Sequence, residues 1–382
     1  MNDGVKQRKA EHVQAALTQD LSAPQSASWR DIHLVHQALP EVDLDAIDTS
    51  VHFLGRPLNY PLLISSMTGG HPDVAAINRN LALAAERYGL ALGVGSQRAG
   101  IVNPDVAHSY AVAREAAPGA FLIANVGAPQ LIRQARAEPF TLEQVRTAIK
   151  MIEANALAVH LNSLQEAAQP EGDRRAVGEA RALKTLVSQL ELPVIAKETG
   201  AGICQEQALL LKSCGVAAID VGGAGGSSMS AMEAVRAADR GDGRSRAIGM
   251  LYRDWGIPTP ISLVEAGVAN LPLIATGGVR SGLDIARALS LGATLVGMAF
   301  PFLKAASESF EAVCELVEEL ILELKVAMQL SGAASVAQMT QVDVVVTGET
   351  YHWLKLRGFE AKLRELAQRR LKTVSWEGRV LL

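Results

Sequence analysis

The stretch Pro272-Leu-Ile-Ala-Thr-Gly-Gly-Val-Arg-Ser-Gly-Leu-Asp-Ile-Ala-Arg-Ala-Leu-Ser-Leu-Gly-Ala-Thr-Leu-Val-Gly-Met-Ala299 is the most informative part of the chain. It reads as an apolar strand, a glycine turn, an amphipathic helix, a second apolar strand and another glycine turn. Glycine lets backbone NH groups approach an anion closely, and a following helix dipole favours negative charge. A (β/α)8 barrel builds its phosphate site at such turns, after strands seven and eight. A phosphorylated cofactor is therefore the first prediction.

Similar apolar runs recur upstream and are separated by amphipathic helical patterns. The expected strands are residues 62–66, 90–95, 121–126, 157–162, 194–197, 217–221, 273–276 and 294–297. Nearly apolar strands of this kind are typical of a parallel sheet covered by helices. Eight units favour closure into a barrel over an open doubly wound sheet. We therefore predict an α/β fold, a (β/α)8 TIM barrel.

Three segments depart from the strand–helix repeat. Residues 1–60 are expected to form an extension that caps the barrel bottom, with 48–58 as one arm of an antiparallel hairpin, while 61–382 form the barrel unit. Residues 236–246 are charged and contain glycine, so we expect a mobile or ligand-ordered segment. Beyond Pro301 the pattern predicts two or three amphipathic helices and a basic tail. Apolar faces on these helices suggest a homo-oligomer.

Composition limits the possible partners and compartments. A chain of 382 residues that is 49% hydrophobic can bury a large core. Its net charge of -4 gives no general attraction for nucleic acid or an anionic membrane. The three cysteines lack metal-ligand spacing, which suggests a reducing compartment. No apolar signal core begins the chain, and no uncharged apolar run reaches membrane-spanning length. We predict a cytoplasmic protein without nucleic-acid or membrane partners.

Polar residues gather at the carboxyl ends of the expected strands, where the active sites of barrels lie. Ser66-Met67-Thr68-Gly69-Gly70 follows the first strand and either holds the edge of a planar ring or forms an ordinary turn. After the second strand, Ser96 and Arg98 offer a hydroxyl and a guanidinium. Arginine can bind phosphate bidentately, or simply lie at the surface. Asn125 ends the third strand and either contacts a heterocycle or caps a helix.

Strand four carries the sharpest combination. His160 and Asn162 lie on one face by the period of two, and Gln165 and Glu166 are expected on the loop that follows. A lone histidine on a strand is more often a satisfied core residue. The four together instead favour a site, because buried polar groups need partners. Glu166 could hold Mg2+, which prefers one or two carboxylates together with phosphate oxygens and water.

Strands five and six add a buried cation and a glycine loop. Lys197 would be a costly unpaired charge inside a barrel, so it needs an anion, and an anionic reduced flavin would supply one. A side-chain pair with Glu198 is excluded because adjacent strand residues point to opposite faces. Asp220-Val-Gly-Gly-Ala-Gly-Gly-Ser-Ser228 follows and could cradle a phosphate or act as a flexible linker.

Together these residues resemble the type 2, flavin-dependent isopentenyl-diphosphate isomerases. The resemblance covers residues 8–300 and rests on Arg8-Lys9-Ala-Glu-His12, Met67-Thr68-Gly69, Gly95-Ser-Gln-Arg98, Asn125-Val-Gly127, His160-Leu-Asn-Ser-Leu-Gln-Glu166, Lys197-Glu-Thr-Gly200, Gly223-Ala-Gly-Gly-Ser227, Trp255-Gly-Ile-Pro-Thr259 and Gly277-Gly-Val-Arg280. It implies a reversible 1,3-proton shift that turns isopentenyl diphosphate into dimethylallyl diphosphate. The implied cofactors are FMN, Mg2+ and NADPH as the reductant.

The resemblance also implies residue roles. The residues implied to hold FMN are Met67, Thr68, Gly69, Ser96, Asn125, Lys197, Ser227, Gly278, Val279, Arg280, Ala299 and Phe300. Those implied to hold the diphosphate substrate are Arg8, Lys9, Arg98, His160, Asn162 and Gln165, with Glu166 as the metal ligand. The implied catalytic residues are His160, Gln165 and Lys197. In this mechanism reduced flavin supplies and removes the protons.

One departure and two alternatives accompany this reading. Where the family commonly has Gly-Gly-Thr-Ser-Trp, this chain has Gly225-Gly-Ser-Ser-Met229, which replaces an indole by a thioether. An FMN-dependent 2-hydroxy acid oxidase would need a histidine base after strand six. No histidine lies between His160 and His352, so that base is missing. A catalytically silent flavin- or phosphate-binding scaffold would have lost the polar strand ends, which this chain retains.

Overall fold

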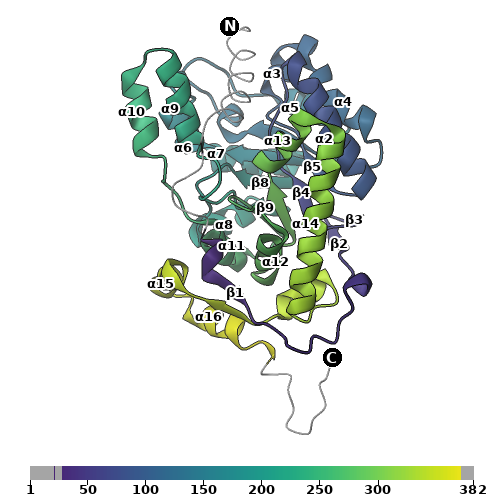
Figure 1. The fold of residues 1–382 in the computed structure, drawn as a ribbon. Helices are drawn as coiled ribbons and strands as arrows, with labels where there is room; N and C mark the ends of the chain where they lie inside the picture. The colour runs from purple at the N-terminus through teal and green to yellow at the C-terminus, as the bar shows by residue number, and fades with distance from the viewer. Residues whose placement is uncertain (1–20, 22–27, 371–382) are drawn as a thin grey trace.

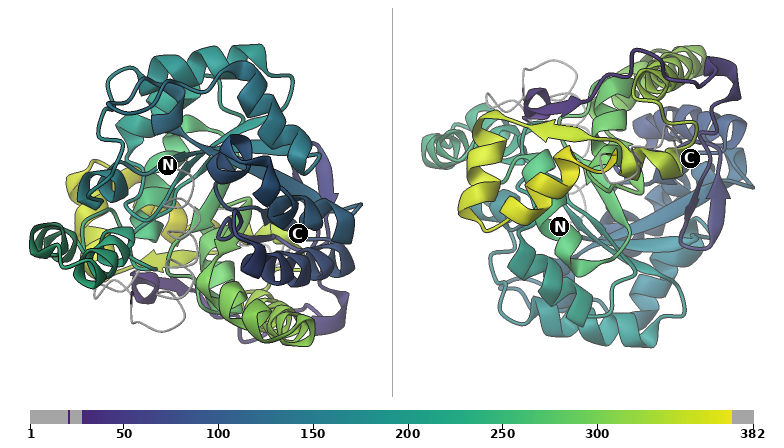
Figure 2. Two further views of the ribbon diagram at one scale, coloured as in Figure 1. Left: turned by 90° about the horizontal axis from the view of Figure 1, so that it is seen from above. Right: turned by 90° about the horizontal axis from the view of Figure 1, so that it is seen from below.

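The computed structural model describes residue 21 and residues 28–370. Its centre is a closed barrel of parallel strands surrounded by helices (Figures 1 and 2). The strands are β4 (Leu62–Ile64), β5 (Ala91–Gly93), β6 (Phe121–Gly127), β7 (Ala156–Leu161), β8 (Val194–Glu198), β9 (Ala218–Asp220), β10 (Leu273–Thr276) and β11 (Leu295–Met298). Because β11 pairs with β4, the sheet has no open edge. Every expected strand overlaps one of these, so the predicted fold class is confirmed.

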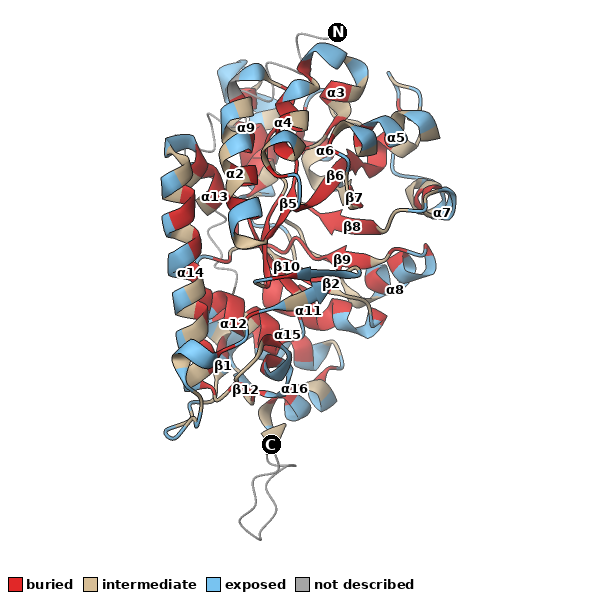
Figure 3. Cartoon of the chain, turned by 90° about the vertical axis from the view of Figure 1, so that its right-hand side faces the viewer, coloured by how far each residue is buried: buried red, intermediate tan, exposed pale blue. Residues whose placement is uncertain are grey.

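The helices that follow the strands cover the outside of the barrel. They are α2 (Ala75–Tyr88), α3 (Arg98–Val102), α4 (His108–Ala116), α5 (Leu142–Met151), α6 (Ser163–Ala168), α7 (Glu179–Gln189), α8 (Gln205–Ser213), α9 (Met229–Asp239), α10 (Gly243–Leu251), α11 (Thr259–Ala266), α12 (Gly282–Ser290) and α13 (Phe300–Glu308). Many have one buried and one exposed face (Figure 3). In the described part of the chain, no helix combines the length and apolarity that crossing a bilayer requires.

Local sequence signals explain where individual helices begin. α5 starts at a capping box, in which the Thr141 hydroxyl accepts from the Gln144 NH and the Gln144 side chain accepts from the Thr141 NH. α10 starts at Asp242, whose carboxylate accepts from the Ser245 NH at 3.0 Å. Such caps satisfy NH groups that have no partner within the helix.

The barrel interior is layered along its axis. Apolar side chains from every strand lie in the lumen, and the last of them along each strand are Leu63, Ala91, Ile123, Ala158, Ile195, Ala218, Ile274 and Leu295. Because side chains alternate with a period of two, the next inward position lies two residues further along each strand. These eight positions, which we name the polar tier, are Ser65, Gly93, Asn125, His160, Lys197, Asp220, Thr276 and Gly297. Polar residues and glycines thus replace apolar ones at the carboxyl end of the barrel.

The opposite end of the lumen is closed by a hairpin of β2 (Val51–Phe53) and β3 (Arg56–Leu58). Phe53 and Leu58 belong to the apolar lumen cluster, and the Phe53 ring lies edge-on to Phe121 with centroids 5.7 Å apart. That residues 1–60 as a whole form a cap stays a prediction. The prediction that 48–58 form a single arm is wrong, because a tight turn at Leu54 and Gly55, both with positive φ, places both arms inside this segment.

The chain beyond the barrel is more elaborate than predicted. After α13 it contains the three helices α14 (Phe310–Leu330), α15 (Gly348–Leu356) and α16 (Glu360–Ala367), within the expected number, and a strand, β12 (Val344–Val346), that was not predicted. β12 pairs antiparallel with β1 (Ile32–Leu34), so residues before the barrel lie beside residues after it (Figure 1). The boundary between residues 60 and 61 stays a prediction.

Residues 236–246 are not the mobile or ligand-ordered segment that their charges and glycines suggest. They form the end of α9 and the start of α10, two helices that pack side by side (Figure 1). Arg236 is 3% exposed because it pairs with Glu233 and Glu171. Its charge therefore joins two elements of the fold rather than facing solvent.

The hairpin should contribute strongly to stability. We expect Phe53→Ala to lower the free energy of unfolding by about 3–5 kcal/mol, because the ring is 1% exposed and its removal leaves a cavity in the lumen. Chemical denaturation measures this change. Arg56→Ala, at an exposed position on the same hairpin, is the control and should have little effect. Equal stabilities of the two variants would contradict the assigned role.

Candidate active site

A cavity of about 250 Å³ lies at the carboxyl ends of the barrel strands. Six positions of the polar tier line it, namely Ser65, Asn125, His160, Lys197, Thr276 and Gly297. The loops that follow the strands supply the walls. Barrel enzymes place their active sites at this end, because side chains from several strands converge there. The cavity is therefore the candidate active site.

Most of the residues expected to hold a cofactor meet at this cavity. Its lining includes Met67, Ser96, Asn125, Lys197, Ser227, Gly278, Val279, Arg280, Ala299 and Phe300. Thr68 and Gly69 are not part of the lining. The Thr68 hydroxyl donates to the Asn78 side chain at 2.5 Å, and a Cβ on Gly69 would collide with the Tyr110 ring. These two residues shape the turn that presents Met67.

The expected substrate residues are also gathered, as far as the structure describes them. Arg98, His160, Asn162, Gln165 and the expected metal ligand, Glu166, line the cavity. Arg8 and Lys9 lie outside the described residues. Arg98 begins α3, and its guanidinium is 2.6 Å from the Asp173 carboxylate.

Two glycine loops meet backbone to backbone at one wall. A Cβ on Gly226, after β9, would lie 2.8 Å from the nitrogen of Gly278, after β10. Gly277 and Gly278 have φ values of +122° and +67°, which side-chain-bearing residues rarely adopt. Glycine therefore allows both loops to approach each other and the cavity.

Arg280 lies beside these loops at the cavity. Burial lowers the pKa of its guanidinium, and an anion bound nearby would raise that pKa again by favouring the charged form.

His160 is oriented by its neighbour on β6. Its Nδ1 lies 2.9 Å from Asn125 Oδ1, while Asn125 Nδ2 donates to the Val94 carbonyl. Because Asn125 uses its NH2 group on that carbonyl, its oxygen is the acceptor for His160. The Nδ1 proton is assigned from this network. In the neutral ring Nε2 is then the acceptor.

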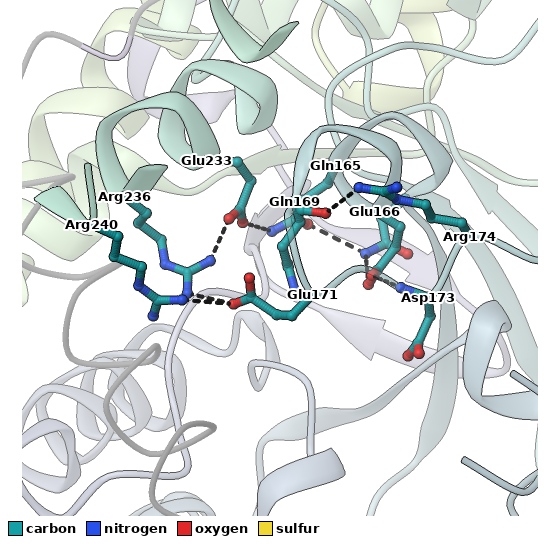
Figure 4. Close-up of polar contacts among 10 residues, drawn as sticks. Gln165, Glu166, Gln169, Glu171, Asp173, Arg174, Glu233, Arg236 and Arg240 are labelled. Carbon is teal, nitrogen blue, oxygen red and sulfur yellow. Dashed lines mark hydrogen bonds and ion pairs between the residues drawn. The ribbon is translucent and has the colours of Figure 1, made fainter. Parts of the chain in front are cut away.

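Gln165 and Glu166 lie on the short helix α6, so the expectation of a loop was wrong. Glu166 Oε1 accepts from Asn162 Nδ2 at 3.0 Å, and Oε2 accepts from the Asp173 NH at 2.7 Å (Figure 4). Gln165 Nε2 donates to Glu233 Oε1 at 2.8 Å. Both side chains are therefore fixed at the cavity wall. Among the described residues, no three His, Cys, Asp or Glu side chains enclose a metal position, so Glu166 offers a single carboxylate.

Charged side chains tie the α6 region to α9. Glu233 pairs with Arg236, and Glu171, in the loop after α6, accepts from Arg236 at 2.8 Å and from Arg240 at 3.3 Å (Figure 4). The same loop carries Asp173, which contacts Glu166. The orientation of Glu166 therefore depends on contacts made well outside the cavity.

Lys197 has an anionic partner that the sequence argument did not identify. Its Nζ lies 3.0 Å from Asp220 Oδ2 on β9. The prediction that Lys197 and Glu198 do not pair side chain to side chain agrees with the geometry, since Glu198 Oε2 accepts backbone NH groups from residues 200–202. Burial raises the pKa of Glu198 to about 7, against the opposing effect of those NH groups.

Buried polar atoms without a partner concentrate at the cavity. In the described part of the chain such side-chain atoms are Ser65 Oγ, Gln130 Oε1, Asn162 Oδ1, Thr276 Oγ1 and Arg287 Nε. All but the last belong to residues that line the cavity. Native proteins pair nearly all buried polar atoms with protein groups, water or ligands, so this grouping marks the cavity as a place where water or a polar ligand binds.

Glycine leaves space between two of these hydroxyl groups. A Cβ on Gly297 would lie 2.4 Å from Thr276 Oγ1 and 2.5 Å from Ser65 Oγ. Any larger residue at this position would therefore fill the floor of the cavity. Two buried hydroxyl groups without a hydrogen-bond partner thus lie at the floor of the cavity, beside a glycine.

Several site residues were missed by the sequence argument. Ser65 and Thr276 could have been found by extending the period of two from the apolar lumen positions. Gln130 lies on the 3-10 turn Ala128–Leu131 directly after β6, so its place after a strand end could have identified it. Asp173 and Glu233 gave no local signal, because they contact Glu166 and Gln165 from a loop and from a separate helix.

Comparison with known proteins assigns the family. A model of the FMN-dependent dehydrogenases matches residues 105–346, more than half of the chain. The isopentenyl-diphosphate delta-isomerase of Methanothermobacter thermautotrophicus is 45% identical over 359 residues, which are 94% of this chain and 98% of that protein. The enzyme of the same name from Methanosarcina mazei is 47% identical over 363 residues, or 95% and 98%.

Solved structures show the same barrel. A lactate oxidase of Pediococcus acidilactici aligns with a TM-score of 0.64 at 16% identity, covering 91% of this chain and 93% of that one. A mandelate oxidase mutant with a monooxide FMN adduct aligns with a TM-score of 0.57 at 18% identity, covering 88% and 92%. At such identities the likeness concerns the fold alone. The sequence identity to the isomerases over nearly the whole chain is the deciding observation, and the chain belongs to the type 2 isopentenyl-diphosphate delta-isomerase family.

Proposed function

We propose that this protein interconverts isopentenyl diphosphate and dimethylallyl diphosphate, with FMN in the cavity and Mg2+ on Glu166. The single observation that carries the proposal is the group of unpartnered polar atoms around the cavity, in a chain so similar to isomerases of this name. A 1,3-proton shift leaves the redox state of the substrate unchanged. NADPH is the proposed reductant of the flavin, and a homo-oligomer in the cytoplasm remains our prediction.

The residues around the cavity fit FMN. The ring would be held by Met67, Ser96, Asn125 and Lys197, since they combine an apolar contact with donors and acceptors. The phosphate would be held by Ser227, by residues 278–280 and by residues 299–300, where the glycine loops bring backbone NH groups to the cavity. Thr68 and Gly69 would act through the turn that presents Met67. When bound and reduced, FMN supplies the acid and base for the proton shift.

The other wall would hold the substrate. Glu166 presents one fixed carboxylate, which suits Mg2+ shared with a diphosphate. Arg98 would turn from Asp173 to the diphosphate, and Arg8 and Lys9 are proposed as further ligands from the family resemblance. His160, Asn162 and Gln165 would orient the carbon chain. Binding the diphosphate tightly matters, because remote binding energy holds an ionisable allylic product in place.

The redox state of the flavin provides the direct test of this function. We expect the protein, isolated with FMN, to isomerise isopentenyl diphosphate under anaerobic conditions after reduction by NADPH or dithionite. Product formation can be followed by mass spectrometry. Full activity of the oxidised protein in air would contradict the mechanism.

The same preparation separates the isomerase from an oxidase. Lactate or glycolate should not bleach the flavin, since the chain has no histidine between His160 and His352 to act as the base. Bleaching by either acid would support the 2-hydroxy acid oxidase instead.

The glycine loops generate a second prediction. Gly226→Ala should weaken FMN binding at least tenfold, about 1.4 kcal/mol, because the new methyl group meets the nitrogen of Gly278 and forces the two loops apart. Fluorescence titration of the apoprotein measures the affinity. Gly243→Ala is the control, since a Cβ there meets nothing within 4 Å. Unchanged affinity in Gly226→Ala would argue against this phosphate site.

Removing the charge of Glu166 tests the metal. Glu166→Gln preserves the shape and should raise the Mg2+ concentration required for half-maximal activity at least tenfold, while FMN affinity stays the same. The physical reason is that an amide oxygen is a weaker ligand for Mg2+ than a carboxylate. Glu143→Gln, at the exposed start of α5, is the control. An unaltered Mg2+ dependence would remove Glu166 from the metal site.

A further inference from the structure

We propose that Asp220 is a positioning residue that fixes the Lys197 ammonium and sets the charge it presents to the cofactor. This inference rests on the proposed function, because it assumes that FMN occupies the cavity. Lys197 lines the cavity, whereas Asp220 does not. Asp220 therefore acts through Lys197 rather than by contact with the ligand.

Strand register brings the two groups together. His160, Lys197 and Asp220 occupy paired positions on β7, β8 and β9, so their side chains lie in one row of the polar tier. The Lys197 and Asp220 side chains are 11% and 2% exposed, with Nζ 3.0 Å from Oδ2. An isolated charge buried to this extent would be costly, and the pairing offsets that cost.

Hydrogen-bond geometry then limits what Lys197 can do. An ammonium group has three NH donors. One is directed to Asp220 Oδ2, and another to the Glu198 carbonyl at 3.2 Å. Two fixed acceptors determine the direction of the third donor, which is available to an acceptor in the cavity. Asp220 thus helps convert a flexible side chain into a directed donor.

The pair also reduces the net charge beside the ligand. A carboxylate 3.0 Å from the ammonium largely cancels its field at a greater distance. With Asp220 in place, Lys197 gives a reduced, anionic flavin a hydrogen bond with little net positive charge. Without that carboxylate, the uncompensated cation would stabilise the reduced form more strongly than the oxidised form.

The midpoint potential of bound FMN tests this inference, measured anaerobically on the full-length holoprotein. Asp220→Asn should favour the reduced flavin at least tenfold, which corresponds to a rise of about 30 mV for a two-electron couple. Asp220→Glu should stay closer to wild type, because it keeps the charge. Glu265→Gln is the matched control, since Glu265 is a fully buried carboxylate that pairs with Arg357 away from the cavity. The midpoint potential of FMN bound to this variant should equal that of the wild type.

A second background shows whether Asp220 acts through Lys197. In Lys197→Met the ammonium that Asp220 orients is absent, so adding Asp220→Asn should leave the potential unchanged. An equal shift in both backgrounds would overturn the inference, as would no shift in either. If the Asp220→Asn variant does not fold, the double variant Lys197→Met/Asp220→Asn is measured instead. The midpoint potential of its FMN must equal that of the Lys197→Met variant. Wild-type protein that binds no FMN would overturn the proposed function as well, whereas equal potentials in flavin-loaded proteins overturn this inference alone.

Discussion

The site depends on a change of side-chain polarity at one level of the barrel lumen. Apolar side chains from all eight strands fill the lumen, and two residues after the last of them the inward positions become polar or glycine. The apolar level supports a closed, packed barrel, and the polar level is satisfied by mutual pairing, by water or by a ligand. His160 pairs with Asn125 and Lys197 with Asp220, while Ser65 and Thr276 have unpartnered hydroxyl groups. The polar tier therefore leaves hydrogen-bonding capacity at the cavity for water or a ligand.

Elements at both ends of the barrel fix the apolar level and the polar tier in place. The hairpin closes the far end of the lumen through Phe53, so the apolar level is covered on both sides. At the near end, α9 reaches the α6 region through Glu233 and Arg236, which are both buried (Figure 4). The α6 region in turn orients Glu166, whose carboxylate accepts from the Asp173 NH. Groups that would bind metal and substrate are thus fixed by packing rather than by the ligands alone, which reduces the entropy lost on binding.

Much of this architecture could be predicted from the sequence because it follows from short-range rules. Apolar runs and glycine turns located the barrel strands, and most of the expected cofactor residues line one cavity. Interactions between distant segments could not be predicted in this way. Nothing near Lys197 identifies Asp220 as its partner, and nothing near Gln165 points to Glu233. Likewise, the charges and glycines of residues 236–246 suggested a mobile or ligand-ordered segment, because the pairing of Arg236 with Glu171 joins two segments that are distant in sequence.

The central claim is that FMN completes the polar tier. A crystal structure of the protein grown with FMN tests it most directly. The account predicts electron density for the flavin ring within hydrogen-bond distance of Ser65 or Thr276 and Lys197, with the phosphate at the glycine loops after β9 and β10. Flavin density elsewhere, or a cavity closed by side chains in the presence of saturating FMN, would contradict it.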